Sequence, residues 1–205
     1  MSTSISGTAG VTFPAGGVGN PASAVVGTTD SQTLTNKTLT SPTITGAAMS
    51  SMASSVITSG TAQASTSGTS IDFTSIPSWV KRITVMFNGV SLSSTANYLI
   101  QIGAGSITST GYVSTANNGS GTSITSTSGF VVTNASAATD LTYGFITINS
   151  FGSNIWTQGG NLNNGNSTRL SAGGVTLSGT LDRLRITTTS GTDTFDAGSV
   201  NILYE

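Results

Sequence analysis

The chain has 205 residues, a formal net charge of −1 and only 6% charged residues, where about a quarter is usual. This charge balance excludes the basic footprint of a nucleic-acid-binding protein and the polybasic patch that binds a membrane surface. Cysteine and histidine are both absent, which excludes disulfides, thiolate metal sites and histidine-based acid–base catalysis.

Serine and threonine make up about a third of the chain, and glycine contributes 26 residues. Threonine is β-branched and favours strands, whereas glycine, serine and asparagine favour tight turns. The composition therefore predicts an all-β protein with many corners and almost no helix. Because no apolar run is long enough to cross a bilayer, we expect no membrane insertion.

Residues 1–28 are mainly glycine, alanine, serine, valine and proline, with too few apolar side chains to build a core. We expect this segment to be an extended peptide that becomes ordered by docking onto another protein. A floppy tail is the alternative that the composition leaves open.

Residues 33–47 contain three copies of a five-residue unit, which reads Thr, aliphatic, Thr and two turn-type residues. Residues five apart in a flat strand point to opposite faces, so Leu34, Leu39 and Ile44 share one environment only if the chain winds. A winding segment this short cannot bury its aliphatic residues alone. Residues 29–56 are therefore predicted to form a stalk that packs against identical copies of the chain.

From about residue 57, short apolar runs alternate with turn-type clusters, which is typical of an antiparallel β-sandwich or jelly roll. We expect residues 57–205 to form one domain, which we call the head. Within residues 181–187 the apolar side chains alternate with two arginines that should point outward. Strands are expected at residues 71–73, 83–87, 98–102, 130–133, 141–148, 155–157, 169–171, 181–187 and 200–204. Turns are expected between them, including Asn88-Gly89, Gly159-Gly160 and Gly173-Gly174.

Catalysis finds little support in the residue types. There are only seven acidic residues, and Asp193 and Asp196 are the one close pair. A glycosidase needs two carboxylates flanking the scissile bond, but aspartates in a Gly- and Thr-rich run more often cap turns. We therefore expect no enzyme activity, no metal and no cofactor.

The two tryptophans have different neighbourhoods. Trp79 precedes an apolar strand and is expected to be buried. Trp156 lies near Asn161, Asn163 and Asn164, so an aromatic ring and several amides are available to bind a sugar. The competing interpretation is a core tryptophan beside a solvated Asn/Gly loop.

Two parts of the chain resemble structural fibre proteins of tailed bacteriophages. One is the linker-like run Thr29-Asp-Ser-Gln-Thr-Leu-Thr-Asn-Lys-Thr-Leu-Thr-Ser-Pro-Thr-Ile44. The other comprises Ile71-Asp-Phe, Ile76-Pro-Ser-Trp-Val-Lys-Arg-Ile-Thr-Val-Met-Phe-Asn-Gly-Val90, Leu184-Arg-Ile-Thr and Asp193-Thr-Phe-Asp-Ala-Gly-Ser-Val-Asn-Ile-Leu-Tyr204, which look like a β-rich domain of tail and head fibres. Together they cover most of the chain after residue 28.

The resemblance implies a homotrimer in the virion, anchored to virion proteins through residues 1–28, whose head binds a bacterial surface glycan or protein. Three chains wound about one axis could turn the pentad aliphatic side chains inward, at about 1.5 to 3 kcal/mol for each one fully buried. A tail fibre is the leading interpretation. A capsid-attached head fibre or decoration protein with a structural or weak adhesive role is the alternative, and a glycan-cleaving tailspike is a remote one.

Overall fold

The computed structural model describes residues 57–117, 121–133 and 137–205. All of them belong to one of the two compact units into which the chain divides, the unit of residues 52–205. The described residues form fourteen strands and no helix, and every strand pairing is antiparallel. The prediction of an all-β, antiparallel protein is thus confirmed for this part of the chain.

Three predictions lie outside the described residues. They are the anchor at residues 1–28, the stalk at residues 29–56, and the inward packing of the stalk side chains Leu34, Leu39 and Ile44. All three stay predictions.

The larger sheet has nine strands, most of them paired in a continuous order. That order is β1 (Thr58–Ser59), β14 (Phe195–Tyr204), β4 (Arg82–Leu92), β10 (Thr142–Gly152), β11 (Ile155–Asn164), β12 (Ser167–Thr176), β7 (Val113–Asn117) and β8 (Ser123–Ser126). The remaining strand, β2 (Gln63–Ala64), pairs with β14.

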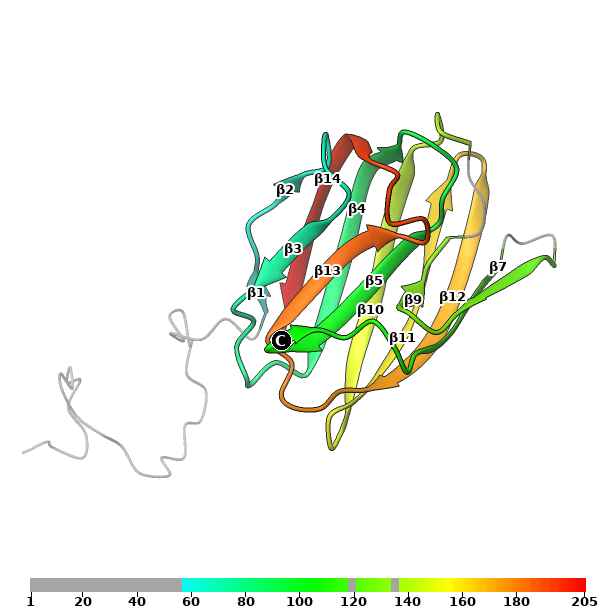
Figure 1. Cartoon of the computed structure of the whole chain (residues 1–205). Helices are drawn as coiled ribbons and strands as arrows, with labels where there is room; N and C mark the ends of the chain where they lie inside the picture. Colours follow the sequence, from blue (N-terminus) through cyan, green and yellow to red (C-terminus); the bar gives the residue numbers. More distant parts are fainter. Residues whose placement is uncertain (1–56, 118–120, 134–136) are drawn as a thin grey trace, which may run out of the picture. The chain divides into compact units, whose positions relative to one another are not determined.

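The smaller sheet has five strands and lies across the face of the larger one, in front of it in Figure 1. Its order is β3 (Ile71–Thr74), β13 (Arg183–Thr188), β5 (Tyr98–Ala104) and β6 (Ser106–Ile107), and β9 (Phe130–Val131) pairs with β5.

The inner faces of the two sheets share one hydrophobic core. Ile146 and Ile148 of β10 are fully buried from the larger sheet, and Leu184 and Ile186 of β13 from the smaller. Strict alternation places one set of side chains inside and the next outside. The predicted alternation of leucine and isoleucine with arginine in β13 is confirmed, because the two arginines are only half-buried.

Three glycine-containing turns expected from the sequence are instead inside long strands. Gly89 lies within β4, where it adopts a φ of 66° and makes a bulge, since Thr142 pairs with Val90 and Tyr143 pairs with Asn88. The glycine pairs at 159–160 and 173–174 lie in the middle of β11 and β12. Glycine in a strand interior can mark a close approach rather than a turn.

Strands β7 and β8 carry mostly serine and threonine, and the sequence pattern did not predict them. Their inward side chains are small: Ala116 is fully buried in a satellite cluster with Leu99 and Val131, and Ile124 packs against that cluster. A strand that buries so little apolar area leaves a weak alternation signal.

Candidate functional site

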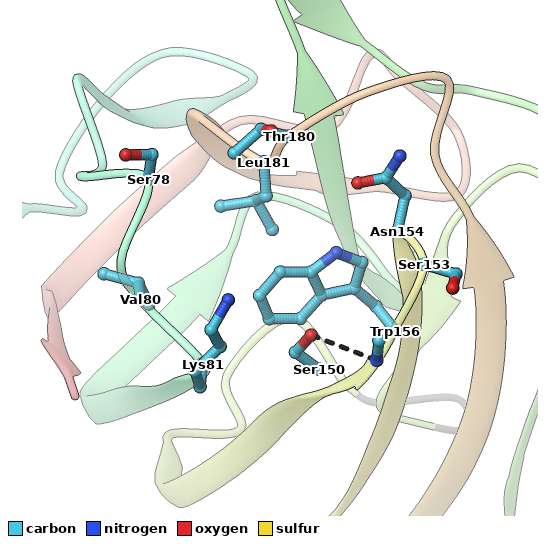
Figure 2. A pocket seen from close by; sticks show the side chains of 10 residues that line it. Ser78, Val80, Lys81, Ser150, Ser153, Asn154, Trp156, Thr180 and Leu181 are labelled. Atoms are coloured by element: carbon cyan, nitrogen blue, oxygen red, sulfur yellow. Dashed lines mark hydrogen bonds between the residues drawn. The ribbon is translucent and has the colours of Figure 1, made fainter.

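A polar pocket of about 160 Å³ lies at one end of the two sheets (Figure 2). Three segments enclose it: the β10–β11 hairpin, the turn before β4 and the link before β13. The lining residues are Ser78, Val80, Lys81, Ser150, Gly152, Ser153, Asn154, Trp156, Thr180 and Leu181.

The β10–β11 hairpin is fixed by its backbone. Ser153 and Asn154 are the only residues between the two strands, and their φ values of 49° and 61° are those of a type I′ turn. The carbonyl oxygen of Asn154 accepts a hydrogen bond of 2.9 Å from the amide nitrogen of Leu177. The hairpin tip is therefore held against the chain that follows β12, and its hydroxyl and amide groups have a fixed position.

The turn before β4 is equally well anchored. The amide nitrogen of Val80 donates to the carbonyl oxygen of Pro77 over 3.1 Å, which closes a turn at this proline. Lys81 donates its amide to the carbonyl of Glu205 at 2.7 Å and accepts at its carbonyl from the amide of Ser150 at 2.8 Å. The Lys81 side chain is exposed, and Figure 2 shows it directed towards the indole of Trp156.

Trp156 forms a wall of the pocket rather than an open platform. Its side chain is only 5% exposed and belongs to the hydrophobic core, together with Val80 and Leu181. Ser150 is its partner across the hairpin, and Figure 2 marks a hydrogen bond between these two residues. A ligand in the pocket would therefore touch the edge of the indole and the polar groups around it.

Lys81 is the charged group at the pocket, and no ion pair to it occurs among the described residues. Three other cations of the described residues do make ion pairs. Arg82 pairs with Glu205, Arg183 pairs with Asp182 at 2.8 Å, and Arg185 pairs with Asp72 at 2.7 Å. The hydrogen bond from Arg183 lowers the pKa of the Asp182 carboxyl, which keeps that pair charged. Lys81 is thus available to an acidic ligand.

The four residues suggested as a sugar site do not come together. Trp156 and Asn164 point to the inner face of the large sheet, whereas Asn161 and Asn163 point to the outer face. Asn164 is buried and donates its side-chain amide to the hydroxyl of Thr142 at 2.8 Å. Trp156 alone lies at the pocket, and a glycan contact by any of the four stays a prediction.

The expected burial of Trp79 is wrong. Its side chain is 51% exposed and its ring packs against Tyr204, with a centroid distance of 5.9 Å. Trp79 lies in the turn after Pro77 and before β4, so about half of its surface stays outside the core.

The two close aspartates accept hydrogen bonds from distant parts of the chain, and Asp196 lies within β14 rather than in a turn. Asp193 accepts a hydrogen bond of 2.9 Å from the amide of Ala96, and Asp196 accepts one from the hydroxyl of Ser91. In the described part of the chain there is no cluster of three acidic side chains arranged to hold a metal ion. The same residues contain no helix of the length and apolarity needed to cross a membrane.

Sequence reasoning missed Lys81 and the hairpin tip as site residues. The sequence indicates the hairpin tip only through the run Gly152-Ser-Asn154, whose residue types favour a turn and which lies between two apolar runs. Nothing in the sequence indicated that this turn meets the residues around 80 and 180. Comparisons with protein-family models, with curated proteins and with solved structures found no match to this chain.

Proposed function

We propose that this chain is a structural fibre protein of a tailed bacteriophage, in which residues 1–28 anchor to the virion and residues 57–205 are displayed to the host. Support comes from the resemblance of residues 29–44 and of the later β-rich segments to such fibres. The antiparallel β-unit that follows the pentads agrees with this arrangement. A displayed head of this kind needs a rigid scaffold that carries binding loops at one end.

The pocket at the β10–β11 hairpin is the observation that carries the receptor role. Hydroxyls of serine and threonine and the amide of Asn154 are suited to bonding sugar hydroxyls, and Lys81 is suited to a carboxylate. Drug-sized sites usually have volumes of about 300 to 1,000 Å³, so this smaller pocket fits one sugar ring. We therefore assign an acidic saccharide unit of a bacterial surface glycan as its ligand.

Binding of the full-length protein to immobilised bacterial surface polysaccharides tests this role. The unmodified chain should bind at least one acidic polysaccharide, and Lys81→Ala should weaken binding by about tenfold, as expected for loss of about 1.4 kcal/mol. Lys37→Ala is the matched control, because it removes the same charge from the predicted stalk. Equal binding by Lys81→Ala and the control would place the receptor contact elsewhere, and failure of the unmodified protein to bind any acidic polysaccharide would contradict the pocket assignment.

The virion protein to which residues 1–28 attach distinguishes a tail fibre from a head fibre. Residues 1–28 of a tail fibre should cross-link to portal, adaptor or tail proteins in the intact virion. A cross-link to the major capsid protein would instead establish the capsid-attached alternative. Release of reducing ends from host polysaccharide by the purified protein would favour the glycan-cleaving alternative.

A further inference from the structure

A second groove lies at the open side of the sandwich, between the edges of the two sheets. β1 and β2 form the edge of the large sheet and β3 forms the edge of the small one, on the same side of the molecule in Figure 1. The groove has a volume of about 490 Å³, about three times the 160 Å³ of the pocket at Lys81. Ligand sites usually have volumes of about 300 to 1,000 Å³, so its size is that of a binding site.

The floor of this groove is apolar and ends at an aromatic pair. Phe73, Ile76 and Ile202 line the groove and belong to the hydrophobic core. Tyr204 also lines it, is half-buried, and packs against the ring of Trp79 at a centroid distance of 5.9 Å. Because Trp79 is 51% exposed, an accessible indole stands beside the groove.

The rim of the groove carries mainly uncharged polar groups. The lining residues with a hydroxyl or a side-chain amide are Ser59, Thr61, Gln63, Thr74 and Ser75. Gln63 donates from Nε2 to the carbonyl oxygen of Asp72 over 2.6 Å, which ties the edge of the large sheet to that of the small one. Asp72 is the charged lining residue, and Arg185 donates to both of its carboxylate oxygens, at 2.7 and 2.8 Å.

Ser75 has a strained backbone at the wall of the groove. Its φ is 59°, which is uncommon for a residue with a side chain. Ser153 and Asn154 also have positive φ values, but they form a two-residue hairpin turn that requires them. Ser75 instead follows β3 directly, and the next residue, Ile76, donates its amide to the carbonyl of Asp182 at 2.9 Å. Backbone strain of this kind is frequent in ligand-binding sites.

We propose that this groove binds a neutral disaccharide unit of a glycan. An aromatic ring beside hydroxyl, amide and carboxylate groups suits a sugar, which has apolar ring faces and hydroxyls at its edge. Among the residues that line the groove there is no lysine or arginine, and Asp72 would repel a carboxylate, so an acidic unit is disfavoured. The inference adds a second site to the acidic-saccharide pocket and depends only on residues 57–205.

An extended peptide added to β3 fits the groove less well. β3 has four residues, and the Gln63 side chain already bonds the Asp72 carbonyl that an added strand would need. The left-handed conformation of Ser75 then ends the extended backbone. A short edge closed in this way is typical of strands that are protected against further pairing.

An array of neutral and acidic oligosaccharides from bacterial surfaces, probed with the full-length protein, tests the groove. At least one neutral member should bind, and calorimetry should show that Trp79→Ala weakens this binding by about tenfold, since the indole is lost. Phe145→Ala is the matched control, because that ring is also 51% exposed but stands on the outer face of the large sheet. Ser75→Gly should weaken binding through loss of the hydroxyl while the urea midpoint does not fall, since glycine adopts this φ without strain.

Acrylamide quenching gives a second readout, because Trp156 is buried and Trp79 is exposed. The bound saccharide should protect Trp79 from the quencher. Protection of Trp79 already in the free protein would show that another part of the chain occupies the groove, which overturns the proposal.

Three further outcomes would also overturn it. Neutral binding that neither Trp79→Ala nor Ser75→Gly weakens would place the saccharide elsewhere. Binding of acidic members alone would remove the groove and leave the receptor role of the Lys81 pocket intact. Binding of a synthetic peptide of residues 33–47, with no neutral saccharide bound, would assign the groove to an extended segment.

Discussion

Tyr112 hydrogen-bonds both backbone groups of Ile102 through a single hydroxyl. The Ile102 amide donates to the phenol oxygen at 2.8 Å, and the phenol donates to the Ile102 carbonyl at 3.2 Å. On this edge of β5, β9 pairs only with Leu99 and Ile100, and β6 only with Gly103 and Ala104. The tyrosine therefore takes the place of a neighbouring strand at the one gap between them.

Replacing Tyr112 by phenylalanine should destabilise the head by about 1 to 3 kcal/mol, because the Ile102 amide is buried and loses its partner. Urea unfolding followed by intrinsic fluorescence measures the effect. Tyr143→Phe is the matched control, since that hydroxyl lies on the exposed outer face and its loss should change little. Equal midpoints for the two variants would show that another group, or water, satisfies Ile102.

Alkaline pH should destabilise the head through two of its four tyrosines. Burial raises the pKa of Tyr98 and of Tyr112 to about 12, from the ordinary value of 10.0. A raised folded-state pKa means that the stabilisation is complete below pH 10 and is lost as the pH rises towards 12. The loss is roughly 2 to 3 kcal/mol for each tyrosine by pH 12.

Unfolding at fixed urea over pH 8 to 12 measures this dependence, and absorbance at 295 nm reports which phenols ionise. Tyr98 and Tyr112 should ionise only as the head unfolds. The Tyr112→Phe variant should lose stability less steeply with pH than the unmodified chain, and identical slopes would contradict the assignment.

Sequence patterns predicted the strands that bury large side chains and failed where burial involves small ones. Residues 71–73 and 98–102 were placed correctly, because Ile, Phe, Tyr and Leu there alternate or cluster between turn residues. β7 was missed because its fully buried apolar residue is Ala116. The pattern predicts a turn at glycines 159 and 160, since only the neighbouring strand β10 reveals that Gly160 allows a close approach of two backbones.

The candidate pocket was beyond reach of sequence reasoning for a different reason. Its groups come from residues near 80, 150 and 180, and their meeting depends on the pairing of β4 with β10 and on the sheets facing one another. Neighbours in sequence were a poor guide as well. Asn163 and Asn164 are adjacent, yet a period of two sends them to opposite faces of the sheet.

The stalk prediction can be tested by a charge at its centre. Leu39→Asp should dissociate the oligomer, because three copies would each bury a carboxylate that has no partner. Thr38→Asp adds the same charge at a neighbouring position that the pentad pattern places outward, and it should leave the mass unchanged. Light scattering of the full-length chain measures both. A heat-stable oligomer in Leu39→Asp would show that this leucine does not face the axis.

Two adjacent glycines on β11 differ in what an added methyl group would meet. A Cβ at Gly160 would lie 2.9 Å from the carbonyl oxygen of Phe145 and 3.0 Å from the Cα of Ile146, both backbone atoms that cannot move away cheaply. Gly160→Ala should therefore destabilise the head by about 1 to 3 kcal/mol. Gly159→Ala meets no atom of its own chain, so its urea midpoint at low chain concentration should match the unmodified protein or exceed it slightly.

Urea unfolding of both variants measures the difference. Equal midpoints for Gly160→Ala and Gly159→Ala would show that β10 moves aside for the methyl group added at residue 160.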